Sequence, residues 1–286
     1  MNVLHSRLQL FLKFIEMTQR YKDKVALVTG GSKGIGKGIV TVFVQQGAKV
    51  CFCARDEDVG KKLEKELNGK YPGSSFFVKC DVAKEEDIIK VVNSTVAKFG
   101  EIDCLVNNAG RHPPDQKIDD ISAAELRSLY DTNVVSYFLF AKYALPSLRK
   151  TKGNIINLSS LVGSMGQPNA VPYVSTKGAI IAMTKAMAID EAVNGVRVNC
   201  ISPGNVWTPM WSKLANEAID TNKATIDGAE AQLMGRYGSM EESGNLALYI
   251  AAEATFTTGV DFLLTGGAEL SYGRKTRVQA QMPSTL

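Results

Sequence analysis

The chain has no long hydrophobic run and no organised set of cysteines. Although 45% of its residues are hydrophobic, no apolar stretch reaches the roughly 18 residues that a membrane-spanning helix needs. The five cysteines are odd in number, lie in or beside apolar runs, and include no C-x-x-C pair. These features argue against a membrane span, a disulfide framework and a metal centre, and favour reduced, buried thiols in a reducing compartment.

The basic charge is absent from most of the chain as well. The formal net charge is +4, but residues 1–24 and 274–286 together carry +6, which leaves about −2 for residues 25–273. A basic footprint confined to the two ends argues against a nucleic-acid-binding groove.

Apolar runs typical of strands alternate with helical patterns along 286 residues. The predicted strands are residues 24–29, 48–53, 75–80, 102–108, 154–160, 196–202 and 260–265. Helices are expected at 35–46, 57–69, 84–99, 122–149, 171–193 and 241–252, and variable loops near 205–238. Because strands that are apolar on both faces belong in a covered parallel sheet, the pattern predicts one doubly wound α/β domain of seven parallel strands with helices on both faces.

The two ends are expected to lie outside this domain, which should span residues 22–273. Residues 1–21 are predicted to be a disordered extension, since "LQLFLKF" is too short for a membrane helix and no cleavage site follows. A mitochondrial presequence is the alternative for this segment, and a cytoplasmic protein is the main expectation. Residues 274–286 form a basic tail.

A glycine-rich loop follows the first predicted strand. The run "TGGSKGIG" places Gly30, Gly34 and Gly36 between a strand and a helix. Glycine there lets the backbone approach a pyrophosphate, and the helix N-terminus attracts its negative charge. "CDV" places Asp81 near the adenine, and "NNAG" (107–110) ends the fourth strand, at the edge where such sheets bind ligands.

Tyr173 and Lys177 lie four residues apart in a helical stretch and so share one helix face. A tyrosine with a pKa of about 10 is a poor base near neutrality, but a neighbouring ammonium favours the phenolate. Tyr173 is therefore the candidate acid/base for an alcohol. Ser160, thirteen residues earlier, is the candidate donor to the substrate oxygen, with Ser159 as the competitor. Asn133 either satisfies the long helix or holds a water that links Lys177 to solvent.

Together these motifs resemble the classical short-chain dehydrogenase/reductase family over residues 22–273. The resemblance implies a Rossmann-type fold, a tetrad of Asn133, Ser160, Tyr173 and Lys177, no metal, and a nicotinamide cofactor. Its implied cofactor-binding residues are Gly30, Ser32, Lys33, Gly34, Ile35, Gly36, Arg55, Asp81, Val82, Asn108, Ala109, Gly110, Tyr173, Lys177, Pro203, Gly204, Val206 and Thr208.

Within that family, "NNAGRHPP", "SSLVGSMGQPNAVPYVSTKGA" and "NCISPGNVWTPMW" are most similar to 17β-hydroxysteroid dehydrogenases of type 14. This similarity implies a cytosolic homotetramer that oxidises a steroid alcohol such as estradiol, with His112 and Gln167 lining the substrate pocket. Oxidation of L-fucose or a similar small polyol is the alternative. A catalytically silent nucleotide-binding sensor is a remote one, because the tetrad is complete.

The end of the second strand departs from this pattern and bears on the cofactor. An acid there selects NAD by binding both ribose hydroxyls, but the sequence has Ala54 followed by Arg55. A guanidinium can pair with a 2′-phosphate, and Lys33 can add to that field. NAD(P) is therefore expected, with NADP accepted at least as well as NAD, although the family resemblance favours NAD.

Overall fold

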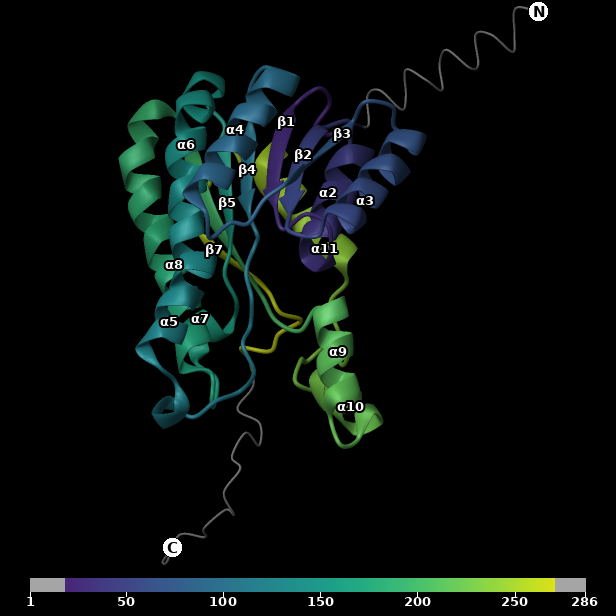
Figure 1. Ribbon diagram of the computed structural model, residues 1–286, viewed down its shortest axis with the longest axis vertical. Coiled ribbons are helices and arrows are strands. Elements are labelled where there is room, and N and C mark those ends of the chain that lie inside the picture. Colours follow the sequence, from purple (N-terminus) through teal and green to yellow (C-terminus); the bar gives the residue numbers. More distant parts are fainter. Residues whose placement is uncertain (1–18, 271–286) are drawn as a thin grey trace, which may run out of the picture.

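The computed structural model describes residues 19–270 (Figure 1). The predicted N-terminal extension therefore lies outside the described residues except at its end, and the basic tail lies outside them entirely. Tyr21 is already part of the core, because its ring packs edge-on against Phe43 at a centroid distance of 5.2 Å. In the described part of the chain, no helix is both long and apolar enough to cross a membrane.

Seven parallel strands form one sheet, as the sequence predicts. Their order is β3-β2-β1-β4-β5-β6-β7. The strand order therefore reverses between β1 and β4: β2 and β3 lie on one side of β1, and β4 to β7 lie on the other. The strands are β1 (Val25–Thr29), β2 (Lys49–Ala54), β3 (Ser75–Lys79), β4 (Cys104–Asn107), β5 (Asn154–Leu158), β6 (Arg197–Pro203) and β7 (Asp261–Leu264). Ligands of such sheets bind at this reversal, outside the carboxyl ends of the strands.

Helices cover both faces of the sheet (Figure 1). One face carries α2 (Gly34–Gln45), α3 (Glu57–Lys70) and α11 (Met240–Ala252). The other carries α4 (Glu85–Phe99), α6 (Ser136–Thr151) and α8 (Val171–Glu191). Successive strand residues point to opposite faces, so Val28 packs in the first core and Leu27 in the second.

The helical region predicted at 122–149 has an interruption. It consists of α5 (Ala123–Tyr130), a π-helical turn (Asp131–Val135) and α6. Such π-helical turns occur frequently at functional sites, and this one contains Asn133, whose side chain is fully buried.

The predicted loops at 205–238 instead contain two helices, α9 (Pro209–Glu217) and α10 (Thr221–Glu230). Their N-termini are capped by the Thr208 and Asp220 side chains, which is a common helix start. A short α7 (Val162–Met165) and a 3₁₀ turn (Ile118–Asp120) complete the carboxyl side. Four strands, β3, β4, β5 and β7, also end earlier than predicted. As a result, Ser160 lies two residues beyond β5 and Asp81 lies two residues beyond β3.

Candidate active site

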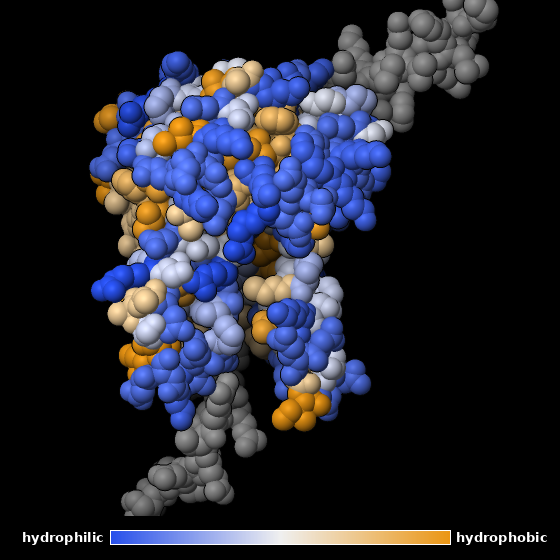
Figure 2. Space-filling view, in the orientation of Figure 1, coloured by the Kyte–Doolittle hydropathy of each residue, from blue (hydrophilic) through white to orange (hydrophobic). Residues whose placement is uncertain are grey.

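A cleft of about 960 Å³ opens at the carboxyl edge of the sheet. It lies between the lobe that carries α7 and the lobe formed by α9 and α10, where the space-filling view is deeply hollowed (Figure 2). Predicted residues that line it are Gly30, Lys33, Gly34, Ile35, Asn108, Ala109, Gly110, His112, Ser160, Gln167, Tyr173, Lys177, Pro203, Gly204, Val206 and Thr208. Ser32, Gly36, Arg55, Asp81, Val82 and Asn133 are not part of its lining.

The glycine loop is held in a conformation that side chains would disturb. Gly30 has a φ of +64°, and a Cβ on Gly36 would lie 2.2 Å from the Gly30 carbonyl oxygen. The Asn108 side-chain amide donates to the carbonyls of Thr29 (2.9 Å) and Gly30 (3.2 Å). Asn108 therefore holds the end of β4 against this loop. This structural role is additional to the cofactor contact that the sequence predicts for it.

The start of α2 suits a bound pyrophosphate. No side chain caps this helix end and no acid lies in its first turn, and its first two residues, Gly34 and Ile35, line the cleft. Gly34, at the first helical position, has a φ of +56°, and the position of its missing Cβ is 3.6 Å from Thr208 Cγ2. These residues fit a dinucleotide: phosphates at the helix end, and the remainder between this loop and the segment after β6.

The predicted adenosine side presents a charge pair at its rim. Lys33 Nζ lies 2.8 Å from the Asp56 carboxylate, and Asp56 also caps α3 by accepting from the Val59 N–H at 3.2 Å. The Lys33 ammonium and that backbone N–H lower the pKa of Asp56. Arg55 is exposed, and the carboxylate of the next residue, Asp56, is already paired with Lys33.

The Asp81 carboxylate accepts a hydrogen bond from the Ala83 N–H at 3.2 Å. The following residue, Val82, is buried. The backbone after β3 is thus fixed by a local turn, and Asp81 is half-buried beside it.

Tyr173 and Lys177 lie on α8 and line the cleft, where Lys177 is buried and Tyr173 is half-buried. Lys177 Nζ is 5.7 Å from the centre of the Tyr173 ring and donates to the Leu158 carbonyl at 2.8 Å. Burial raises the pKa of Tyr173 to about 12, and a hydrogen bond with Ser160 opposes that rise. Burial also lowers the pKa of Lys177 to about 8. In the protein by itself, desolvation thus outweighs the lowering of the tyrosine pKa that the sequence predicts.

The two serines after β5 have different environments. Ser159 Oγ donates to the Lys177 carbonyl at 2.7 Å, and its side chain is buried. Ser160 is half-buried and shares a hydrogen bond with Tyr173. The structure therefore favours Ser160 over Ser159 as the residue beside the reacting oxygen.

Asn133 binds backbone and a neighbouring helix rather than facing the cleft. Its Oδ1 accepts from the Arg111 N–H at 2.9 Å, and its Nδ2 donates to the Arg111 carbonyl at 3.0 Å and to Thr176 Oγ1 at 3.2 Å. The side chain thus fixes the loop that begins at Arg111 to α8. This agrees with the first of the two sequence interpretations of Asn133, a satisfied helix residue.

His112 lies directly beside the candidate acid/base. Its ring centre is 4.2 Å from that of Tyr173, and its Nδ1 is 2.6 Å from the Pro113 carbonyl oxygen. A carbonyl can only accept, so Nδ1 carries the proton and Nε2 remains an acceptor. Gln167, from the loop after α7, also lines the cleft.

The polar residues that connect β1, β4, β5 and α8 beneath the cleft were not identified from the sequence. Asn107 Nδ2 donates to Asn157 Oδ1, whose own amide donates to Thr184 on α8, both at 2.9 Å. Thr29 Oγ1 accepts the N–H groups of Asn108 and Ala109, also at 2.9 Å each. Polar residues inside the otherwise apolar strand runs were the available signal, because buried amides and hydroxyls need partners.

Comparisons with known proteins agree with this architecture. The short chain dehydrogenase family model matches residues 24–218. L-fucose dehydrogenase of Bos taurus is 51% identical over 271 residues, which cover 94% of this chain and 98% of the relative. L-fucose dehydrogenase of Mus musculus is 52% identical over 256 residues, which cover 90% of this chain and 92% of the relative.

A solved structure is similar over the same region. L-sorbose reductase from Gluconobacter frateurii, crystallised with NADPH and L-sorbose, has a TM-score of 0.84 at 29% identity, covering 88% of this chain and 98% of that one. Fold, glycine loop, catalytic pair and these matches agree: the chain belongs to the short chain dehydrogenase family and uses NAD(P) as its cofactor.

Proposed function

We propose that the protein oxidises a secondary alcohol of a sugar, L-fucose or a close analogue, and that residues 22–273 carry this activity. The observation that carries the proposal is the position of His112, whose ring lies 4.2 Å from that of Tyr173. Its Nε2 can accept a bond from a hydroxyl next to the reacting carbon, as a polyol requires. The names of the two mammalian relatives support the same substrate.

The steroid expectation receives no support from these relatives, since the names they carry specify a sugar. The cleft does contain apolar side chains from α9, among them Met210, Trp211 and Leu214. An aromatic side chain such as Trp211 also suits the C–H face of a sugar, so the apolar wall is compatible with the sugar proposal.

In the proposed mechanism, Tyr173 accepts the alcohol proton at its phenolic oxygen. Ser160 orients the same substrate oxygen by hydrogen bonding, and Lys177 supplies positive charge that favours the phenolate. A bound oxidised nicotinamide would supply the acceptor for the hydride that leaves the substrate carbon. Asn133 acts by holding the Arg111 loop on α8.

We further propose that NADP is accepted at least as well as NAD, because Ala54 leaves the end of β2 without the acid that repels a 2′-phosphate. Arg55, exposed beside this position, is the candidate phosphate partner. Homotetramer formation and a cytoplasmic location, the latter preferred over mitochondria, are retained as proposals from the family resemblance.

The deciding experiment measures initial rates with the purified protein on L-fucose, L-sorbose and estradiol, each with NAD and with NADP. We expect reduced cofactor to form fastest with L-fucose, and Tyr173→Phe to serve as the inactive control. Faster turnover of estradiol would restore the steroid hypothesis. Cofactor binding without turnover of any alcohol would favour the silent sensor.

A further inference from the structure

The segment between β6 and α11 is organised around one buried glutamine. Gln232 lies after α10, and only 4% of its surface is exposed. Its Oε1 accepts the Asn205 N–H at 2.8 Å, and its Nε2 donates to the Arg236 carbonyl at 2.5 Å. The amide oxygen and the amide nitrogen of Gln232 therefore both bind main chain. The oxygen binds residue 205, which precedes α9 in the sequence, and the nitrogen binds residue 236, which follows α10.

The same side chain lies against the glycine that begins this segment. A Cβ on Gly204 would lie 2.9 Å from Gln232 Oε1, so the absence of a side chain at 204 permits this approach. Asn205 is held at two further points: its carbonyl accepts from the Gly238 N–H at 2.9 Å, and its amide donates to the Gly228 carbonyl at 2.8 Å. Within residues 19–270, Gln232 is the acceptor recorded for the Asn205 backbone N–H.

The residues that follow form the wall of the cleft. Gly204, Asn205, Val206 and Thr208 all line it, and Thr208 also caps α9. A backbone fixed at 205 therefore fixes the start of this wall three residues before Thr208. Within residues 19–270, the hydrogen bonds of the Gln232 side chain go to Asn205 and Arg236, and neither residue belongs to the glycine loop or to the end of β2, where the adenosine is expected.

We infer that Gln232 is a positioning residue for the nicotinamide half of the cofactor. It touches neither cofactor nor substrate, and acts by holding the 204–208 backbone in the shape that receives the nicotinamide. This inference rests on the family resemblance, which implies that Thr208 contacts the nicotinamide amide.

The test compares two ligands of the full-length protein, NADPH and 2′-phospho-ADP-ribose, the second of which lacks only the nicotinamide. Gln232→Met keeps the length of the side chain and removes both hydrogen bonds. We expect the dissociation constant of NADPH to rise about tenfold, equivalent to about 1.4 kcal/mol, and that of 2′-phospho-ADP-ribose to stay within about twofold of its original value. Met234→Ala, on the same turn and with its residue 63% exposed, is the matched control and should leave both constants unchanged.

Equal weakening of both ligands would show a merely structural role and overturn the inference, as would no change for either. If Gln232→Met fails to fold, hydrogen exchange on the unmodified protein decides: the Asn205 amide must exchange at least about a hundredfold more slowly than an open amide. Fast exchange there would equally overturn the inference. A failure of the sugar assay with normal NADPH binding would remove the proposed substrate and leave this inference intact.

Discussion

The carboxyl and amino edges of the sheet differ in which helix ends they carry and in whether the protein supplies charged partners for them. At the carboxyl edge, helices begin, and the start of α2 has neither a side-chain cap nor an acid. At the amino edge, α11 ends beside a cation: Arg197 donates to the carbonyl of Ala251 in the last turn of α11 at 3.1 Å and to that of Ala254, two residues beyond the helix, at 3.0 Å. Because a helix C-terminus carries partial negative charge, this edge attracts cations that the protein itself supplies.

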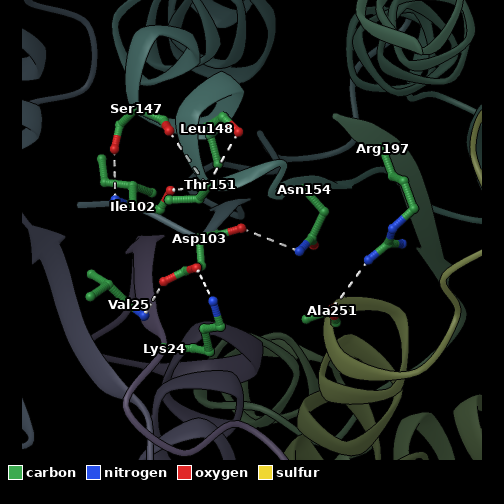
Figure 3. Close-up of polar contacts among 10 residues, drawn as sticks. All are labelled: Lys24, Val25, Ile102, Asp103, Ser147, Leu148, Thr151, Asn154, Arg197 and Ala251. Carbon is green, nitrogen blue, oxygen red and sulfur yellow. Dashed lines mark hydrogen bonds and ion pairs between the residues drawn. The ribbon is translucent and has the colours of Figure 1, made fainter. Parts of the chain in front are cut away.

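The amino edge also has a hollow, of about 550 Å³, but the charges around it are mostly paired with the protein (Figure 3). Asp103, almost fully buried, accepts from Lys24 Nζ and from the Val25 N–H, both at 2.8 Å. Asn154 donates to the Asp103 carbonyl at 3.3 Å. This edge therefore stabilises the sheet, whereas the carboxyl edge has an uncapped helix start and the Tyr173/Lys177 pair in its cleft.

The largest expected effect is a loss of kcat without a loss of thermal stability. Tyr173→Phe removes only the phenolic oxygen and its proton at the carboxyl edge. Loss of a general acid/base typically costs about 10²–10⁴-fold in rate, so kcat should fall by that amount while the melting temperature and NADPH affinity stay unchanged. Stopped-flow and steady-state rates provide the measurement. Turnover close to that of the unmodified enzyme would rule out Tyr173 as the proton acceptor.

The opposite result is expected at the amino edge. Asp103→Ala leaves the buried Val25 N–H without an acceptor, which together with the lost side-chain packing should lower the free energy of unfolding by about 3 kcal/mol. Lys24, whose side chain is 52% exposed, can return to water and adds little to that loss. The kcat of the folded fraction should not change.

Asp103→Asn is the matched variant, because its amide oxygen can still accept from Val25. Urea melts should therefore rank Asn between the original protein and Ala. A loss of kcat in a fully folded Asp103→Ala variant would contradict the division of tasks between the two edges.

The third prediction concerns Lys177, whose burial at the carboxyl edge should lower the free energy of unfolding of the protein. Burial lowers its pKa to about 8 from an ordinary 10.5, so between these pH values the unfolded chain binds more protons than the folded one. Stability due to this group therefore rises with pH from about 8 to 10.5 and is lowest below pH 8. The full range corresponds to on the order of 3 kcal/mol.

Lys177→Met should remove this pH dependence, lower activity, and make the protein more stable than the original at pH 7. The Leu158 carbonyl keeps a partner in the variant, since Tyr137 Oη donates to it at 3.2 Å. Denaturant melts at pH 7 and pH 9.5 measure the difference. If the stability gap between variant and original were the same at both pH values, the buried lysine would not be the cause.

Sequence patterns predicted the sheet and its helices because continuous apolar runs alternate with amphipathic ones. They also predicted the Tyr173/Lys177 pair, since local spacing alone sets its helix face. The π-helical turn around Asn133 was not predicted, because its cause is tertiary: the Asn133 amide binds Arg111 and Thr176. The α9–α10 lobe was missed as well. Its polar, glycine-containing sequence is typical of a loop, and its two helices begin at side-chain caps on Thr208 and Asp220.

Charge placement near the cofactor shows the same limit. The sequence identified Arg55 and Lys33 as cations near a 2′-phosphate. Only the structure shows that Lys33 and Asp56 pair with each other at 2.8 Å. Pairing between residues 23 positions apart depends on how β1 and β2 lie side by side, which no local pattern contains.

The smallest expected effect concerns this pair and the choice between cofactors. Asp56→Asn keeps an oxygen that can cap α3 at Val59, removes the negative charge, and leaves Lys33 without its carboxylate. Both changes favour a 2′-phosphate, so the kcat/KM ratio of NADP to NAD should rise. The rise should be severalfold and at most about tenfold, because exposed charges are weakly coupled and screened.

Two controls sharpen the cofactor test. Ala54→Asp restores an acid at the ribose position and should shift the ratio in the other direction, toward NAD. Raising the ionic strength should reduce the Asp56→Asn effect, since the Debye length falls from about 10 Å at 0.1 M to about 3 Å at 1 M. A ratio that responds to neither substitution would mean that the charges at the end of β2 do not select the cofactor, and that shape contacts to the adenosine do.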